Sequence, residues 1–237
     1  MTIDPRTRGL RIAITGGTSG LGLALAREFR ARGAQVAFVA RTRERVERLA
    51  REASAGIGIV GDVSRKLDIH PTATQILGGL GGLDVLVNNA SSLGPVPLRL
   101  LGDTDCEDFE AAIATNVLGP FRLTRAVLGA LAAAARERGR SVVVNVSSDA
   151  AVNAYAGWGA YGATKAALQH MTRIWDREMT PLGVRFISID PGDMDTPLHA
   201  LAVPDADRTT LTAPDVAARR IADTIARALE ASAEQAA

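Results

Sequence analysis

Short apolar runs alternate with helical segments along most of this sequence of 237 residues. The runs are continuously apolar and lack the period-two pattern of a strand with one wet face, so each predicts a strand buried on both sides. Strands that alternate with helices form a parallel sheet with helices on both faces, so the pattern predicts an α/β, Rossmann-like, doubly wound fold. The expected strands are 10–15, 35–40, 57–60, 83–87, 141–146 and 184–189, and the expected helices are 21–32, 43–54, 69–77, 107–138, 159–179 and 214–231.

The length fits one domain, so we expect residues 1–237 to form a single Rossmann domain. We expect an N-terminal arm over 1–9, a frayed tail over 232–237 and a loop over 197–212 at the sheet edge where ligands bind. Six strands are expected, in the order 3-2-1-4-5-6 that is typical of the doubly wound fold. The last expected helix runs almost to residue 237, so we expect no strand after it.

Charge and hydropathy argue against several classes of function. The chain has 27 basic and 26 acidic residues without a long run of one sign, which argues against a nucleic-acid or acidic-membrane partner. No apolar run reaches membrane-spanning length, and residues 1–9 lack the apolar core of a secretory signal. Cys106 is the only cysteine, so no disulfide forms within the chain. We therefore expect a cytoplasmic protein that acts on a small molecule.

A glycine-rich loop lies between the first expected strand and the first expected helix, with glycines at Gly16, Gly20 and Gly22. Glycines at such a turn let the backbone approach a pyrophosphate, and the helix N-terminus adds free N–H groups and positive potential. The strand–turn–helix context therefore favours nucleotide binding. The alternative is a glycine-rich turn that holds no ligand.

The residues after the second expected strand indicate which dinucleotide is bound. An acidic residue there would bind the ribose 2′-hydroxyl of NAD(H), but the chain has Arg41 and Arg43, with no acid before Glu44. A guanidinium matches a 2′-phosphate, so the sequence predicts NADP(H) in preference to NAD(H). The alternative for Arg43 is a solvated residue in the first turn of a helix.

Tyr161 and Lys165 are four residues apart and lie on one face of an expected helix. A nearby ammonium favours the phenolate, so we expect Lys165 to lower the pKa of Tyr161 and allow proton exchange at neutral pH. Tyr-x-x-x-Lys is common on ordinary helix surfaces, so the pair gains weight only from the motifs around it.

Several separated motifs resemble, in order, those of the classical short-chain dehydrogenase/reductase family, and the similarity covers about residues 10–196. Ser148 stands thirteen residues before Tyr161, which is similar to the family's catalytic spacing. Ser91 departs from the pattern, because the family usually has glycine there. The matching motifs are the glycine loop at 15–22, Asp-Val at 62–63, Asn-Asn-Ala at 88–90, Asn116, Asn-Val-Ser-Ser at 145–148, Tyr161 with Lys165, Pro-Gly at 191–192 and Thr196.

The resemblance implies an NADPH-dependent oxidoreductase that interconverts a carbonyl and an alcohol. It implies that Ser148 holds the carbonyl oxygen, that Tyr161 exchanges its proton and that Lys165 also binds the nicotinamide ribose. Asn116 and a water would return the proton. Together with the arginines, the cofactor-binding residues are then Gly16, Thr18, Ser19, Gly20, Leu21, Gly22, Arg41, Arg43, Asp62, Val63, Asn89, Ala90, Ser91, Tyr161, Lys165, Pro191, Gly192, Met194 and Thr196.

Pro120 follows Asn116 by four positions and has no N–H, so inside a helix it cannot donate to the Asn116 carbonyl. One consequence is an oxygen kept free for the water that the resemblance implies. The other is a simple kink that lets a long helix follow the sheet.

The loops after the fourth, fifth and sixth strands should line the substrate pocket and are largely apolar, which predicts an apolar or aromatic ketone or aldehyde. The alternatives are a non-catalytic NADP-binding regulatory protein and, on the same scaffold, an epimerase or dehydratase, which needs a larger substrate domain. His70, His170 and His199 show no metal-ligand spacing and are expected to be solvated. Asp193 and Asp195 are expected to be loop acids, and Asp149, which follows Ser148, either touches the substrate or is a loop-end acid, the interpretation that we prefer. The apolar candidates are Leu93, Val96, Leu98, Tyr155, Trp158, Met194, Leu198 and Leu201.

The resemblance also implies an assembly. In the family, the last strand forms one tetramer interface and two long helices form another. With no seventh strand, we expect a homodimer through the helices 107–138 and 159–179, with a tetramer as the alternative.

Overall fold

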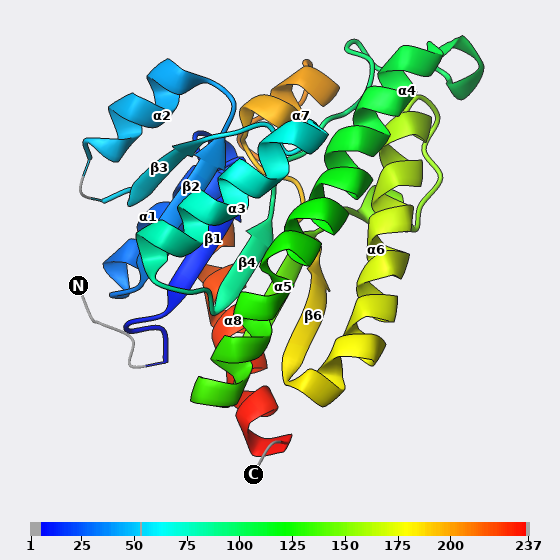
Figure 1. Ribbon diagram of the computed structural model, residues 1–237. Coiled ribbons are helices and arrows are strands. Elements are labelled where there is room, and N and C mark those ends of the chain that lie inside the picture. The colour runs from blue at the N-terminus through cyan, green and yellow to red at the C-terminus, as the bar shows by residue number, and fades with distance from the viewer. Residues whose placement is uncertain (1–5, 53, 236–237) are drawn as a thin grey trace.

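The computed structural model describes residues 6–52 and 54–235 and contains six parallel strands in the order β3-β2-β1-β4-β5-β6 (Figure 1). The predicted fold class and strand order are confirmed, and no seventh strand occurs among the described residues. The strands are β1 (Arg11–Thr15), β2 (Gln35–Ala40), β3 (Ile57–Val60), β4 (Val85–Asn88), β5 (Ser141–Val146) and β6 (Val184–Ile189).

Helices cover both faces of the sheet. Helices α1 and α8 pack against one face, and α3, α5 and α6 pack against the other (Figure 1). Strands β4 and β5 are buried along their whole length, which explains their continuously apolar sequences. The helices are α1 (Gly20–Ala31), α2 (Arg43–Ala50), α3 (Lys66–Leu80), α4 (Cys106–Ile113), α5 (Gly119–Arg138), α6 (Gly159–Met179), α7 (Pro197–Ala202) and α8 (Pro214–Gln235).

Helix α3 is longer at both ends than the predicted 69–77. Its buried residues Ile69, Ile76 and Leu80 recur at helical spacing, so core packing continues the helix through two glycines. The helix ends at Gly81, whose φ of 68° is the left-handed conformation common at helix C-termini. By contrast, α2 is shorter than the predicted 43–54 and ends at Ala50.

The predicted continuous helix 107–138 is wrong, because a π-helical turn, η2 (Ala114–Leu118), separates α4 from α5. Pro120 has no N–H for the usual i→i−4 bond, and a wider turn with a Gly119 N–H to Ala114 bond forms instead. The same turn brings Gly119 against the backbone of Val63, since an added Cβ would lie 3.0 Å from that carbonyl oxygen.

The stretch 106–138 is long and apolar enough, by length and composition alone, to cross a membrane; no other helix in the described part of the chain is. Its residues Leu123, Val127 and Leu131 are fully buried in the cluster formed with the sheet and α3. This is the packing of a core helix.

The two ends of the chain differ in part from expectation. Helix α8 extends to Gln235, so residues 232–235 are helical where a frayed tail was predicted. Residues 6–9 of the predicted arm form a turn, while 1–5 and 236–237 lie outside the described residues.

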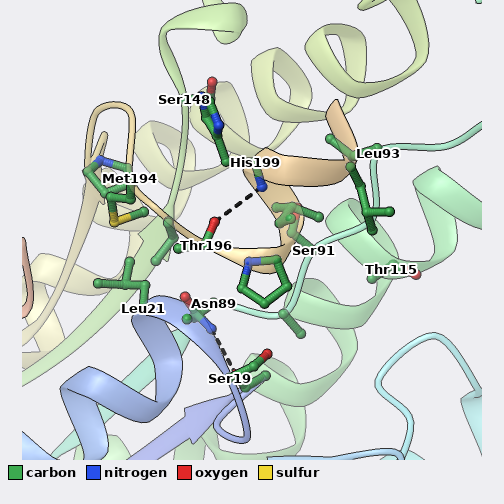
Figure 2. Close-up of a pocket in the computed structure, with 18 of the residues that line it drawn as sticks. Ser19, Leu21, Asn89, Ser91, Leu93, Thr115, Ser148, Met194, Thr196 and His199 are labelled. Carbon is green, nitrogen blue, oxygen red and sulfur yellow. Dashed lines mark hydrogen bonds between the residues drawn. The ribbon is translucent and has the colours of Figure 1, made fainter. Parts of the chain in front are cut away.

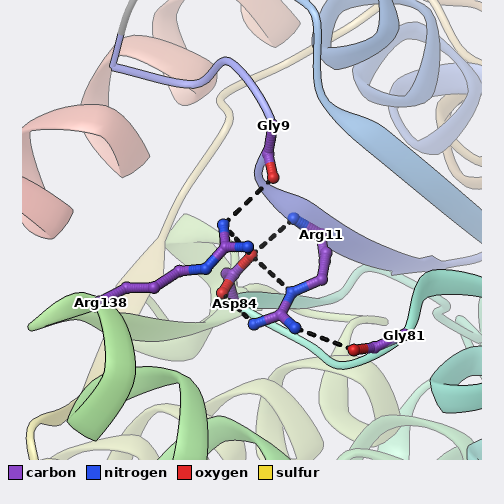
Figure 3. A network of polar contacts seen from close by, with 5 residues as sticks. All are labelled: Gly9, Arg11, Gly81, Asp84 and Arg138. Atoms are coloured by element: carbon purple, nitrogen blue, oxygen red, sulfur yellow. Dashed lines mark hydrogen bonds and ion pairs between the residues drawn. The ribbon is translucent and has the colours of Figure 1, made fainter.

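A buried ionic cluster joins β1, the start of β4 and the end of α5 (Figure 3). The Asp84 side chain is fully buried and accepts hydrogen bonds from the Arg11 backbone N–H at 2.7 Å, Nε at 3.0 Å and Nη2 at 2.8 Å. Arg138 Nη1 lies 3.4 Å from the same carboxylate and also donates to the carbonyl of Gly9. Two guanidinium groups thus compensate one buried charge at the amino end of the sheet.

We expect Asp84→Asn to lower the free energy of unfolding by about 3 kcal/mol, because it leaves two arginines facing a buried neutral group. Urea denaturation at neutral pH measures the change. Asp215→Asn is the matched control, since its pair with Arg219 is exposed on α8 and should contribute less than about 0.5 kcal/mol. If the free energy of unfolding fell equally in the two variants, the buried cluster would contribute no more to stability than an exposed ion pair.

Candidate active site

The glycine loop after β1 is held by close backbone contacts that only glycine permits. Gly16 and Gly20 have φ values of 68° and 49°, in the left-handed region. A Cβ on Gly22 would lie 2.2 Å from the Gly16 carbonyl oxygen and 2.5 Å from Asn89 Nδ2. Gly22 therefore allows α1 to pack against the loop and does not itself line the cavity described below.

A polar latch joins the carboxyl ends of β1 and β4. The Thr15 hydroxyl is buried and accepts hydrogen bonds from the N–H groups of Asn89 and Ala90, both at 3.0 Å. The Asn89 side-chain amide donates to the Thr15 carbonyl at 2.9 Å and to the Gly16 carbonyl at 3.3 Å. The latch fixes the loop after β4 beside the glycine loop.

A second buried polar network continues across the sheet. Asn88 Nδ2 donates to Asn145 Oδ1 at 2.8 Å and to Thr124 Oγ1 at 3.2 Å, and Asn145 Nδ2 donates to Thr172 Oγ1 at 2.8 Å. These bonds join β4 and β5 to α5 and α6. Asn88 and Asn145 therefore hold the ends of β4 and β5 in place beside the site, and neither side chain lines the cavity described below.

One cavity of about 440 Å³ opens at the carboxyl ends of the strands (Figure 2). It brings together every predicted catalytic or cofactor residue except Gly22, Arg43 and Asn116. The predicted residues that line it are Gly16, Thr18, Ser19, Gly20, Leu21, Arg41, Asp62, Val63, Asn89, Ala90, Ser91, Ser148, Tyr161, Lys165, Pro191, Gly192, Met194 and Thr196.

Arg43 does not line the cavity, whereas Arg45 does. Arg43 is exposed and lies 3.4 Å from Glu47 on the next turn of α2, as the solvated alternative predicted. The sequence analysis missed Arg45, which lies in the first turn of α2, because Arg41 precedes the helix and the spacing of the two arginines gave no signal.

Asn116 lies in the π turn, is fully buried and does not line the cavity. Its Nδ2 donates to the Ser92 carbonyl at 2.7 Å and to Thr164 Oγ1 at 2.8 Å. Its Oδ1 accepts from the Ser92 N–H at 2.8 Å and from the Ser91 hydroxyl at 3.2 Å. The side chain thus ties the loop after β4 to α6, and Ser91 is accommodated by this contact.

Lys165 is buried in α6 behind Tyr161. Its Nζ donates to the Val146 carbonyl at 2.7 Å and lies 5.4 Å from the centroid of the Tyr161 ring. Burial disfavours the ammonium and lowers the pKa of Lys165 to about 8.

The expectation that Lys165 lowers the pKa of Tyr161 is wrong in this structure. Burial of the phenol raises its pKa to about 12, and the nearby carboxylate of Asp190 acts in the same direction. The Ser148 and Ser91 hydroxyls lower this pKa and offset part of the rise. Tyr161 is therefore a neutral phenol at pH 7, able to donate a proton.

Ser148 precedes a 3₁₀ turn, η3 (Asp149–Ala151), after β5. Its Oγ accepts from the Ala150 N–H at 3.2 Å and donates to Asp149 Oδ1 at 3.1 Å. The Tyr155 hydroxyl donates to Asp149 Oδ2 at 2.7 Å. Asp149 lines the cavity, which agrees with the first of the two interpretations of this residue and not with the preferred one.

The loops after β4, β5 and β6 form a mostly apolar wall. Of the apolar candidates, Val96, Leu98 and Tyr155 do not line the cavity, and the other five do. His199, expected to be solvated, is only 16% exposed and lies 3.8 Å from Asp193. The Thr196 hydroxyl accepts from the His199 N–H at 3.2 Å and so begins α7. The apolar lining residues of this wall are Leu93, Trp158, Met194, Leu198 and Leu201, and the loop after β6 adds the polar residues Asp190, Asp193 and His199.

Comparison with known proteins gives a consistent set of similarities. The model of a family described as short chain dehydrogenase matches residues 11–207. A 2-(R)-hydroxypropyl-CoM dehydrogenase from Xanthobacter autotrophicus is 34% identical over 194 residues, which is 79% of this chain and 76% of that protein.

Two solved structures have the same fold. A 3-ketoacyl-(acyl-carrier-protein) reductase from Brucella melitensis, complexed with NADH, has a TM-score of 0.84 and 26% identity over 92% of this chain and 91% of that one. A short chain dehydrogenase from Burkholderia cenocepacia in complex with NADP has a TM-score of 0.81 and 26% identity over 93% and 91% of the two chains.

Proposed function

This chain belongs to the short-chain dehydrogenase/reductase family and is an oxidoreductase of the alcohol–carbonyl pair; from that premise we propose that it uses NADPH to reduce an apolar or aromatic ketone or aldehyde. The observation that supports the proposal is the convergence of Ser148, Tyr161 and Lys165 on the cavity that begins at the glycine loop. A regulator that binds NADP without turnover would have no need of this arrangement.

The residues around the glycine loop fit a dinucleotide. The loop presents backbone N–H groups at the N-terminus of α1, and a Cβ at Gly22 would close the space in which loop and helix meet. We assign the adenine to Asp62 and Val63, which line the cavity after β3, and the nicotinamide amide to Thr196. When bound, the cofactor supplies the hydride.

The proposed proton transfer follows from the state of Tyr161. Its phenol is protonated at neutral pH, so it donates a proton to the carbonyl oxygen as the carbon becomes an alcohol. Ser148 turns its hydroxyl from Asp149 to the same oxygen and fixes its position. The Lys165 ammonium, whose pKa of about 8 is below that of the phenol, then supplies the proton that restores the phenol.

We assign Asn116 to proton return through its backbone carbonyl. All the hydrogen-bonding groups of its side chain are engaged, but Pro120 has no N–H to donate to that carbonyl. A water bound there would return protons to Lys165. The side chain acts by positioning the loop after β4.

The preference for NADPH over NADH rests on Arg41 and Arg45, which line the cavity after β2 where no acid does. Guanidinium groups form strong, charge-assisted bonds to phosphate. In this proposal Arg45 takes the role that the sequence analysis predicted for Arg43.

The apolar wall supports the substrate class. Trp158, Leu93 and Leu198 offer a surface for an aromatic or aliphatic skeleton beside Ser148. We place the enzyme in the cytoplasm, where the exposed Cys106 stays reduced.

We also propose a homodimer through α5 and α6, which lie side by side on one flank of the molecule (Figure 1). Ile174 is 45% exposed and Leu118 36% exposed on this flank, beside the ring pair of Phe121 and Trp175. Light scattering should give twice the monomer mass, and Ile174→Arg should give the monomer. A monomeric wild type would contradict the assembly but not the activity.

Tyr161→Phe should lower kcat for carbonyl reduction by at least about 100-fold, because general acid catalysis contributes that much and the phenyl ring keeps the buried shape. The dissociation constant for NADPH, measured by fluorescence, should change little. A variant that reduces a good substrate at the wild-type rate would show that the phenol is not the acid.

The pH profile should report Lys165. Its ammonium is present below pH about 8 and is lost above it, so kcat/KM for NADPH, which reflects free-enzyme groups, should fall as pH rises through about 8. Tyr161, with a pKa of about 12, should add no descending limb below that pH. A rate that stays level to pH about 10 would exclude a need for the charged lysine.

Arg41→Ala should lower kcat/KM for NADPH by about 10- to 100-fold and leave that for NADH within about twofold, because only NADPH carries the 2′-phosphate. Arg43→Ala is the control and should change neither, since its side chain is exposed beside Glu47. If kcat/KM of the wild type for NADH equalled or exceeded that for NADPH, the cofactor proposal would fail.

A further inference from the structure

We propose that Asp149 selects carbonyl substrates that bear a protonated amine, by pairing its carboxylate with the ammonium group at the substrate end of the cavity. The inference rests on the proposed function and narrows its substrate class. Asp149 directly follows Ser148 and its Oδ1 lies 3.1 Å from the Ser148 hydroxyl, so one molecule can reach both side chains.

The carboxylate of Asp149 is held in place but not neutralised. Its Oδ1 accepts from the Ser148 hydroxyl and its Oδ2 accepts from the Tyr155 hydroxyl, so each oxygen is oriented by a neutral donor. A carboxylate has about four acceptor positions, which leaves capacity for further donors. Within residues 6–52 and 54–235, no lysine or arginine is ion-paired with it.

The other charges at this end of the cavity do not compensate Asp149. Asp190 and Asp193 are further acids in the lining, and His199 lies beside Asp193. Lys165 is buried and directs its Nζ to the Val146 carbonyl. The substrate end therefore attracts a cation and repels an anion.

The basic residues of the cavity lie at its other end. Arg41 follows β2 and Asp149 follows β5, and the strand order places β1 and β4 between them. Three strand spacings separate the two positions by roughly 14 Å. The arginines are thus placed for the cofactor phosphate, and they leave the charge at Asp149 unopposed.

An aromatic side chain completes the subsite. Trp158 lines the cavity and its ring meets the Tyr161 ring edge-on, with centroids 5.8 Å apart. An indole face attracts a cation, and neighbouring leucines accept the apolar part of the molecule. The ligand that fits is an apolar or aromatic ketone with one ammonium group. A carboxylate or a phosphate would meet like charge.

The test compares three acetophenones of similar shape that differ at one substituent: para-(aminomethyl), para-ethyl and para-carboxy, together with their meta isomers. NADPH oxidation gives kcat/KM for each, and a compound that is not reduced is scored by its inhibition constant against a ketone that is. We expect kcat/KM for the better aminomethyl isomer to exceed that for its ethyl counterpart at least tenfold, mainly because its KM is lower. The carboxy compounds should have the lowest kcat/KM.

Asp149→Asn keeps the shape and removes the charge; because Asp149 is an exposed residue, the ratio of aminomethyl to ethyl compound should fall by about three- to fivefold. Asp149→Glu should retain a ratio above one. Asp205→Asn removes an exposed acid outside the cavity and should keep the wild-type ratio within twofold.

Two outcomes would overturn the inference while leaving the proposed function intact: a wild type that reduces carbonyls but uses the ethyl compounds at least as well, and an Asp149→Asn variant that keeps the wild-type ratio. If the enzyme failed to oxidise NADPH with every carbonyl compound offered, the proposed function would be overturned, and the inference with it.

Discussion

The site depends on how closely the carboxyl ends of β1 and β4 approach each other. The Thr15 hydroxyl accepts hydrogen bonds from two backbone N–H groups of the loop after β4, and the Asn89 side-chain amide donates to the carbonyls of Thr15 and Gly16. Helix α1 fits against this latch only because Gly22 has no Cβ. The connections that follow β1 and β4 lead to helices on opposite faces of the sheet. The latch between them therefore also defines the crevice in which the cavity forms. The opposite end of β1 is fixed by charge, through Arg11 and Asp84.

Burial sets the chemistry of the acid–base residues more than their mutual contact does. Tyr161 and Lys165 are four residues apart, and both are almost completely buried. Desolvation raises the pKa of Tyr161 and lowers that of Lys165, which favours the neutral form of each. The phenol is thereby kept as a proton donor at neutral pH. The lysine is brought into the range where it gains and loses a proton. In the function that we propose, the acids around Ser148 make the substrate end of the cavity negatively charged.

The fold was predictable in class, strand order and strand number, because buried parallel strands and their crossover helices leave an alternating pattern that is local in sequence. The ends of elements were less predictable. Helix α3 continues past two glycines because Leu80 packs in the core, and the stretch 107–138 breaks where Pro120 lacks a donor and Gly119 meets Val63. The proline was visible in the sequence. The contact that makes a wider turn favourable was not.

By itself, the sequence determined the glycine loop, the arginine after β2, the order Ser148, Tyr161, Lys165 and the family that these residues indicate, since each is a matter of residue type and spacing. Only the tertiary structure decided which side chains face the cavity. It placed Arg45 in the cavity lining and Arg43 outside it, engaged the Asn116 side chain in a buried network and brought Asp149 between two hydroxyls. It also decided the sign of the Tyr161 pKa shift. Spacing along a helix places two groups near each other, but the loss of water around them depends on chain segments that are distant in the sequence.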